Sequence, residues 1–321
     1  MSKKILSVIS ILIITFSFLF VTACNGMNDD NKGKVDTPKT PPVSSQDTTP
    51  VFYDYAAPDF NRVIDGMTLT FFDEFDGTEL DLDKWIYERE SWYSQNGAVQ
   101  RYRNSNVSVN DGLLTIEVRN KNNPIDDKDV GTVTSGAVKT QDKFSQTYGR
   151  IEARMRVPTY TGAWPCFWMM PQTINAYGGG WPYSGEIDIA EFKGRFNTRV
   201  AGSIHNAYSG GYDHAVGKAY YLPWNSPIDR FHVYALIWTP DYMDFEVDGV
   251  VYQRITKEQW TTSHYASGSS QPFDRPFYIT FSCGVGGILD GHRLPDLDNF
   301  STSYMQIDYL RVYQFNEFLA G

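Results

Sequence analysis

The chain has 321 residues, a formal net charge of -10 and a pI of about 5.0. This acidic balance argues against nucleic-acid binding, which needs a basic face to neutralise phosphates. It also disfavours a uniformly anionic polymer as a partner. The length allows one large or two ordinary domains. Aromatic residues make up 15% of the chain, including 8 Trp and 21 Tyr, enough for an aromatic binding surface as well as a core.

The N-terminus has the pattern of an export signal. Lys3 and Lys4 precede an apolar run over residues 5–22. The run ends in Val-Thr-Ala-Cys, which resembles a bacterial lipoprotein signal whose cleavage leaves Cys24 as the lipid-bearing first residue. An ordinary signal peptide or a membrane anchor is the alternative, and all three export the remaining chain. We expect a signal peptide over residues 1–23 and a lipoprotein anchored outside the cytoplasm, at the cell envelope or surface.

A composition change marks the start of the folded domain. Residues 24–57 contain few large apolar side chains and predict a disordered, lipid-anchored linker. A β-rich pattern then begins, and we expect one folded domain over residues 58–316. Residues 317–321 form a short C-terminal tail.

The folded domain is predicted to be all-β. Two β-rich runs flank Asp111-Gly112, and two more flank Asp248-Gly249, which is the signal of a β-hairpin. Neither a convincing helical period nor an internal repeat is present. Many short strands separated by turn residues predict an antiparallel sandwich or jelly roll. The other predicted strands span residues 68–72, 149–157, 163–170, 199–205, 232–238, 276–283 and 305–313.

Residues 186–191, Glu-Ile-Asp-Ile-Ala-Glu, form the most informative segment. Alternation predicts a strand with Glu186 and Asp188 on one face. Like charges on one face do not stabilise a strand, so another role is expected. Glu191 breaks the alternation, and one extra residue, a β-bulge near Ala190, would return it to the acidic face. The Cα atoms of the two glutamates would then lie ~13 Å apart. Inward-leaning side chains can close this to the ~5–5.5 Å of a retaining glycosidase pair.

The order and spacing of several motifs resemble those of glycoside hydrolase family 16, and within it the bacterial laminarinase-like endo-β-1,3-glucanases. The resemblance runs from about Phe71 to Tyr313. It implies a β-jelly roll of two curved antiparallel sheets with a concave substrate cleft. It also implies hydrolysis of internal β-glycosidic bonds with retention. The motifs begin at Phe72, Thr147, Trp164, Trp181, Phe231, Trp238, Val247 and Asp308.

The resemblance gives each acid a role. Glu186 matches the nucleophile, Glu191 the general acid/base, and Asp188 the residue that tunes the pair. Retaining hydrolysis needs one carboxylate to form the glycosyl-enzyme and a second carboxyl that is protonated first and acts as a base later. Three close carboxylates cannot all ionise freely, so one proton is held near neutral pH. A solvated acidic face and a Ca²⁺ site built from the three carboxylates are the alternatives.

Aromatic planes near the acids are candidates for stacking on pyranose rings. Trp181 follows three glycines and is the first candidate, Trp164 the second, and Trp168 faces either the substrate or the core. His205 matches a histidine of the family's cleft and is expected to bond a sugar or the acid carboxyl. The predicted substrate-binding residues are Trp164, Trp168, Trp181, His205, Asn96 and Gln100.

No cofactor is expected for the chemistry. The family often carries a structural Ca²⁺ held largely by backbone carbonyls, and the matching positions are Glu74, Gly112 and Asp308. Such an ion would join distant strands. Cys166 and Cys283 form either a disulfide, as an oxidising compartment invites, or two buried thiols; we favour the thiols.

The predicted protein is a monomeric enzyme acting on a β-1,3 or mixed β-1,3-1,4 glucan. A galactan such as agarose, porphyran or carrageenan is the rival substrate, since Lys193 and Arg195 could meet a sulfate. A transglycosylase of the same family is a second rival. A non-catalytic glucan-binding protein on the same fold is the third.

Overall fold

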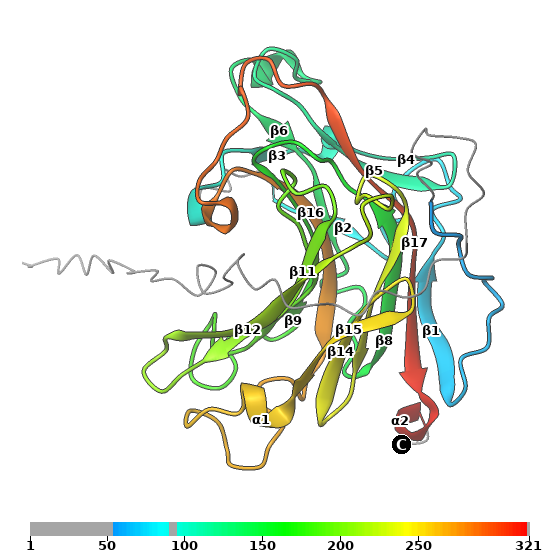
Figure 1. Cartoon of the computed structure of the whole chain (residues 1–321), viewed down its shortest axis with the longest axis vertical. Helices are drawn as coiled ribbons and strands as arrows, with labels where there is room; N and C mark the ends of the chain where they lie inside the picture. Colours follow the sequence, from blue (N-terminus) through cyan, green and yellow to red (C-terminus); the bar gives the residue numbers. More distant parts are fainter. Residues whose placement is uncertain (1–53, 90–94, 320–321) are drawn as a thin grey trace, which may run out of the picture.

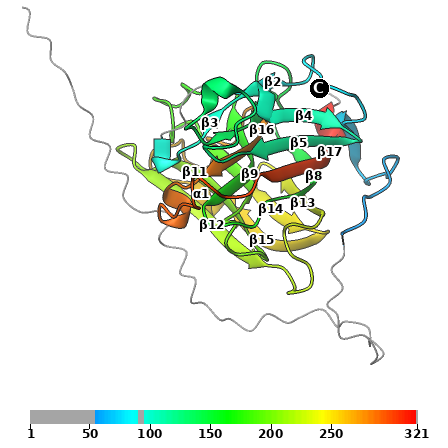
Figure 2. The ribbon, with the colours of Figure 1, turned by 90° about the horizontal axis from the view of Figure 1, so that it is seen from above.

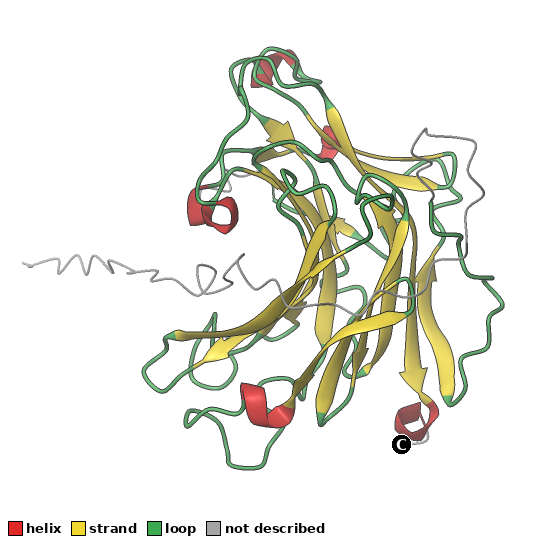
Figure 3. Ribbon diagram, viewed as in Figure 1, coloured by secondary structure: helices red, strands yellow, loops and turns green. Residues whose placement is uncertain are grey.

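The computed structural model describes residues 54–89 and 95–319. Cys24, the predicted signal peptide and most of the predicted linker lie outside these ranges. Strands dominate the described chain and form two stacked, curved antiparallel sheets (Figure 1, Figure 3). A short parallel pair, β3 (Arg101–Tyr102) and β6 (Thr134–Ser135), lies outside both.

The first sheet has eight strands. Its centre is β17 (Ser303–Phe315), which lies between β5 and β8 in the view from above (Figure 2). β1 (Met67–Asp73) pairs with the C-terminal half of β17. The remaining order is β15 (Val250–Thr256), β14 (Tyr242–Val247), β13 (His232–Trp238), β8 (Gly149–Arg156), then β17, β5 (Leu113–Val118) and β4 (Val107–Asn110).

The second sheet has seven strands, and β10 (Glu186–Glu191) lies near one edge. The order is β12 (Asp213–Tyr221), β11 (Arg199–Ala207), β10, β9 (Ala163–Pro171), β16 (Phe277–Val285), β7 (Ala137–Lys139) and β2 (Ile86–Tyr87). Helical segments in the described chain are short: α1 (Lys257–Trp260), α2 (Asn316–Leu319), and the 3₁₀ turns η2 (Gln95–Gly97), η3 (Asn104–Asn106), η4 (Asp127–Asp129) and η5 (Ile288–Asp290). Within residues 54–89 and 95–319, none of these is long and apolar enough to cross a membrane.

The core lies between the two sheets and follows from strand alternation. On β9, Phe167 and Met169 are buried while their neighbours on the other face are half-buried. On β10, Ile187 and Ile189 point into the same core. Alternation therefore sends apolar side chains of the second sheet inward and its acids and tryptophans outward.

Both predicted hairpins are confirmed, because β4 pairs with β5 and β14 with β15. The prediction missed β12, a nine-residue strand at the edge of the second sheet. The segment just before the predicted start of the domain contacts Phe231: the Phe231 backbone N–H donates to Asp54 at 2.9 Å, and the Tyr55 N–H donates to the Phe231 carbonyl at 2.7 Å.

Candidate active site

The predicted bulge in β10 is confirmed by its register with both neighbours. Asp188 lies opposite Ser203 of β11, while Glu191 lies opposite Ala201, so three steps on β10 match two on β11. The register with β9 shifts at the same place, between Asp188 and Ala190. The extra residue buries Ile189 and Ala190 in succession, with 2% and 0% of their surface exposed. Glu191 thereby returns to the outer face that carries Glu186 and Asp188, which we call the carboxylate face.

An indole N–H donates to each glutamate. Trp164 Nε1 lies 2.9 Å from Glu191 Oε1, and Trp181 Nε1 lies 2.5 Å from Glu186 Oε2. Trp164 comes from β9, whereas Trp181 comes from the loop that leads into β10. The two predicted sugar platforms are therefore also the hydrogen-bond partners of the two outer acids.

Asp188, between them, is buried and bonds to β11. Ser203 Oγ donates to Asp188 Oδ2 at 2.8 Å, and His205 Nε2 lies 3.3 Å from the same oxygen. The other ring nitrogen, His205 Nδ1, lies 2.9 and 3.1 Å from the two carboxylate oxygens of Asp213. His205 thus bridges two carboxylates.

Burial and mutual repulsion shift the acids toward protonation. Burial, followed by the charge of Asp188, raises the pKa of Glu191 to about 7. Burial and Asp188 also raise the pKa of Glu186 well above its ordinary value, and His205 and the Trp181 N–H oppose this rise. A carboxyl with a pKa near 7 can donate a proton in one step and accept one in the next, close to neutral pH.

Strand parity settles the orientation of Trp168. It lies in register with Asp188 and Thr280, on the carboxylate face, and its Nε1 donates to Ser282 Oγ at 3.1 Å. Trp164 and Trp168 are both half-buried and alternate with the buried Phe167. Both tryptophans therefore lie on the side of the sheet that holds the acids.

The loops at one end of this face support Trp164. A Cβ on Gly287 would lie 2.5 Å from Cζ3 of Trp164, so only glycine lets the ring approach this closely. The carbonyl of Asn96 borders the same glycine, which puts the predicted Asn96 loop beside Trp164. Gln100 is placed differently from the prediction. Its side chain has no exposed surface and its Oε1 accepts the Val285 N–H at 2.8 Å, so it lies buried beside the end of β16.

Sequence reasoning missed Ser203, Asp213, Ser282 and Gly287. The two serines lie on predicted strands, but nothing in their local sequence shows which side chain they meet. Gly287 lies beyond the last residue of the predicted strand 276–283. Asp213 belongs to the strand that was not predicted, and the pairing of β12 with β11 brings it to His205.

The carboxylates at the predicted calcium positions are paired with arginines. Arg311 Nε and Nη2 donate to the two oxygens of Glu74 at 2.8 Å, and Arg154 Nη1 donates to Asp308 Oδ2 at 2.9 Å. Gly112 lies in the β4–β5 turn. Across the described ranges, no group of three or more His, Cys, Asp or Glu side chains could hold a metal ion. A calcium bound through backbone carbonyls stays a prediction.

The two cysteines are free, as we favoured. Cys166 lies opposite Ser282, and Cys283 lies opposite Pro165 on the paired strand, so the two side chains point to opposite faces of the sheet. Burial raises the pKa of Cys283 to about 12. Cys283 is therefore a core packing residue, whereas Cys166 lies half-buried on the carboxylate face.

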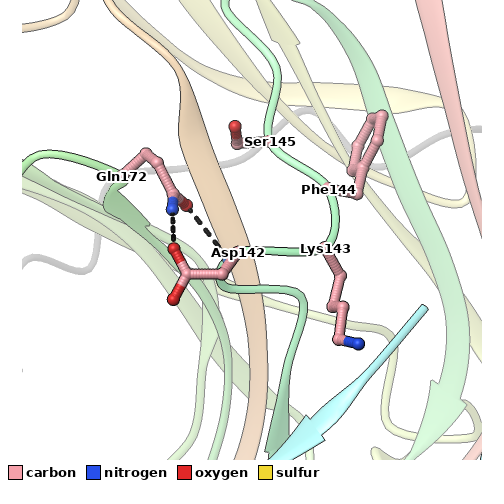
Figure 4. A pocket seen from close by; sticks show the side chains of 5 residues that line it. All are labelled: Asp142, Lys143, Phe144, Ser145 and Gln172. Atoms are coloured by element: carbon pink, nitrogen blue, oxygen red, sulfur yellow. Dashed lines mark hydrogen bonds between the residues drawn. The ribbon is translucent and has the colours of Figure 1, made fainter. Parts of the chain in front are cut away.

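A separate surface pocket lies between the end of β9 and the loop that joins β7 to β8 (Figure 4). It is lined by Asp142, Lys143, Phe144, Ser145 and Gln172, with Gln172 hydrogen-bonded to Asp142. None of these residues belongs to the predicted site.

A two-sheet β-sandwich whose curved sheet gathers three carboxylates and indole rings on its outer face is the architecture of a glycoside hydrolase. The model of the glycosyl hydrolases family 16 matches residues 94–310, and the chain belongs to this family.

Three similar proteins agree with this assignment. A glucan endo-1,3-beta-glucosidase A1 of Niallia circulans is 37% identical over 78% of this chain, which spans 38% of that relative's length. A beta-glucanase of Rhodothermus marinus is 36% identical over 78% of this chain and 86% of its own length. The catalytic domain of an endo-1,3-beta-glucanase (laminarinase) from Thermotoga petrophila RKU-1 superposes with a TM-score of 0.67 at 32% identity, covering 79% of this chain and all of that domain.

Proposed function

We propose that the protein is a retaining endo-glycoside hydrolase that cuts internal β-1,3 or mixed β-1,3-1,4 glucan linkages. The observation that carries this proposal is the bulge, because it brings Glu186 and Glu191 to one face with Asp188 between them. There, burial and the charge of Asp188 raise the pKa of Glu191 to about 7. The names of the similar proteins, which are glucanases, support the glucan.

The match of the motif to the family gives the roles, and the contacts are compatible with them. Glu191 gives its proton to the leaving glycosidic oxygen while a Glu186 oxygen attacks the anomeric carbon, forming the glycosyl-enzyme. Glu191, now ionised, takes a proton from water, which attacks the same carbon and releases Glu186. Asp188 hydrogen-bonds Glu186 and repels charge on both glutamates, so one proton stays available at neutral pH. Passing the sugar to a second saccharide instead of water would make the enzyme a transglycosylase.

The residues just past the motif favour a neutral glucan over a sulfated galactan. Arg195 Nε donates to the buried Asp290 at 2.6 Å, and its guanidinium lies 3.7 Å from the Phe196 ring. Lys193 is buried and already interacts with another group of the protein. The two cations proposed to meet a sulfate are therefore already engaged within the protein.

We propose that the enzyme acts outside the cytoplasm, anchored through a lipid on Cys24. The sequence pattern of residues 1–24 supports this proposal. Wild type should incorporate radiolabelled palmitate and a Cys24→Ser variant should not; equal labelling of both proteins, or of neither, would contradict the anchor.

The test of function pairs Glu186→Gln with Glu117→Gln, a matched change on β5, where Glu117 is ion-paired with Arg119 outside the site. Products from laminarin, lichenan and agarose are separated by chain length. We expect wild type and Glu117→Gln to release oligosaccharides from laminarin or lichenan, and Glu186→Gln to bind the glucan without cutting it. Activity on agarose alone would overturn the substrate, and full activity of Glu186→Gln would overturn the mechanism and favour a site elsewhere.

A further inference from the structure

His205 lies between two carboxylates that come from different strands. Its Nε2 lies 3.3 Å from Asp188 on β10, and its Nδ1 is within 3.1 Å of both oxygens of Asp213 on β12. A neutral imidazole has one N–H and can donate to only one of them. Only the imidazolium donates to both carboxylates at once.

We propose that Asp213 is a positioning residue of the reaction: it fixes the His205 ring and keeps it cationic, so that the ring neutralises Asp188 beneath the two glutamates. This inference deepens the proposed function and rests on the roles given there to Glu186 and Glu191. Asp213 contacts neither glutamate in the structure; its action passes through His205.

The surroundings of His205 support a cation. Asp188 and Glu186 face it from β10, Asp213 faces it from β12, and the Trp181 ring lies 6.0 Å away. The neighbouring His214 points to the opposite face of β12, where it bonds Asn206. Burial alone would lower the pKa of His205, but the hydrogen bonds to Asp188 and Asp213 outweigh burial and raise it well above its ordinary value. Asp213 is the one carboxylate of this group that stands outside the proposed chemistry.

Loss of the Asp213 charge has a defined consequence for the acids. His205 lowers the pKa of Glu186 and of Glu191. If His205 loses its proton within the assay range, this effect disappears and Glu186 becomes harder to ionise. The acid limb of the pH profile of kcat/KM then moves to higher pH, because that limb reports the ionisation of the nucleophile.

The experiment compares Asp213→Asn with Asp248→Asn. Asp248 bonds the buried His232 at 2.7 Å on the other sheet, so this control removes the same charge from a histidine away from the site. We expect Asp213→Asn to lower kcat/KM about 10- to 100-fold, the effect of losing a hydrogen bond between charged groups, and to shift the acid limb upward. Asp248→Asn should leave the limb in place.

Two further measurements separate positioning from a structural or direct role. In ¹⁵N NMR, the His205 ring, assigned by its absence in His205→Gln, should carry two protons at pH 7 in wild type and should titrate in Asp213→Asn. In the His205→Gln background, adding Asp213→Asn should change kcat/KM less than twofold, since two residues that act through one contact are not additive.

A neutral His205 in wild type at pH 7, or an equal loss from Asp213→Asn with and without His205, would overturn the inference. The NMR result does not depend on which acid is the nucleophile. An active Glu186→Gln enzyme would therefore refute the proposed function. If His205 were cationic in the same experiments, the inference that Asp213 keeps His205 charged would still be supported.

Discussion

Replacing Trp164 with phenylalanine removes one donor from the acid/base and keeps an aromatic ring on the carboxylate face. The indole N–H that donates to Glu191 Oε1 at 2.9 Å favours the ionised carboxyl and lowers its pKa. Burial and Asp188 raise it further than the indole lowers it, to about 7. Without the donor, the pKa of Glu191 rises.

The size of the effect follows from the strength of one hydrogen bond to a charged group. Such a bond contributes about 1.5 kcal/mol. One pH unit corresponds to about 1.4 kcal/mol, so the basic limb of kcat/KM should move up by about one unit. The acid limb should stay, because the Glu186 carboxyl bonds to Trp181 and not to Trp164.

The assay is the pH profile of kcat/KM on a soluble glucan, with Trp168→Phe as the matched control. Trp168 lies on the same face and also loses an indole hydrogen bond, but its partner is the Ser282 hydroxyl. The basic limb of the Trp168→Phe profile should therefore stay in place, even if KM changes. An unmoved basic limb in Trp164→Phe, or an equal shift in both variants, would refute the assignment of Glu191 as the acid.

Two further predictions concern packing and stability. Gly287→Ala should displace the Trp164 ring, since the new Cβ would lie 2.5 Å from it, and lower kcat/KM about 10-fold or more. Gly131→Ala, also at positive φ but with no atom within 4 Å of its Cβ, should keep full activity in the same assay, and equal losses would contradict the packing role. Burial raises the pKa of Glu191 from 4.5 to about 7, so its carboxyl favours folding below pH 4.5 and loses this contribution as the pH rises through 7. Glu191→Gln should therefore have a higher free energy of unfolding than wild type at pH 8, by roughly 3 kcal/mol at most, and an equal one at pH 4; a less stable variant at pH 8 would contradict the shift.

The sequence was most informative where alternation and charge conflict. Strict alternation would put Glu191 on the buried face, opposite to Glu186. Because a charged side chain there is unfavourable, the sequence alone places the bulge to within a residue. The hairpins at Asp111-Gly112 and Asp248-Gly249 were equally plain, because the first residue of each turn has positive φ, and glycine follows it.

The sequence did not predict the edge strand of the second sheet or the contacts between side chains that lie far apart along the chain. β12 is the outermost strand, and seven of its nine residues are half-buried whichever face they occupy, so no apolar alternation marks it. The contact of Asp213 with His205 depends on that strand pairing. Gln100 was assigned to sugar contact by its place in a motif, yet its side chain is buried and bonds the backbone of Val285.

The central claim is that Glu186 forms a covalent bond to the sugar while Glu191 supplies the proton. The most direct test is to inactivate the enzyme with a 2-deoxy-2-fluoro-β-glucan oligosaccharide carrying a reactive leaving group, which slows release of the glycosyl-enzyme. Peptide mass spectrometry then locates the sugar. We predict that the label lies on Glu186 and that Glu117→Gln, but not Glu186→Gln, accumulates it. A label on Glu191 or Asp188, or turnover with no covalent species and α-configured products, would contradict the account.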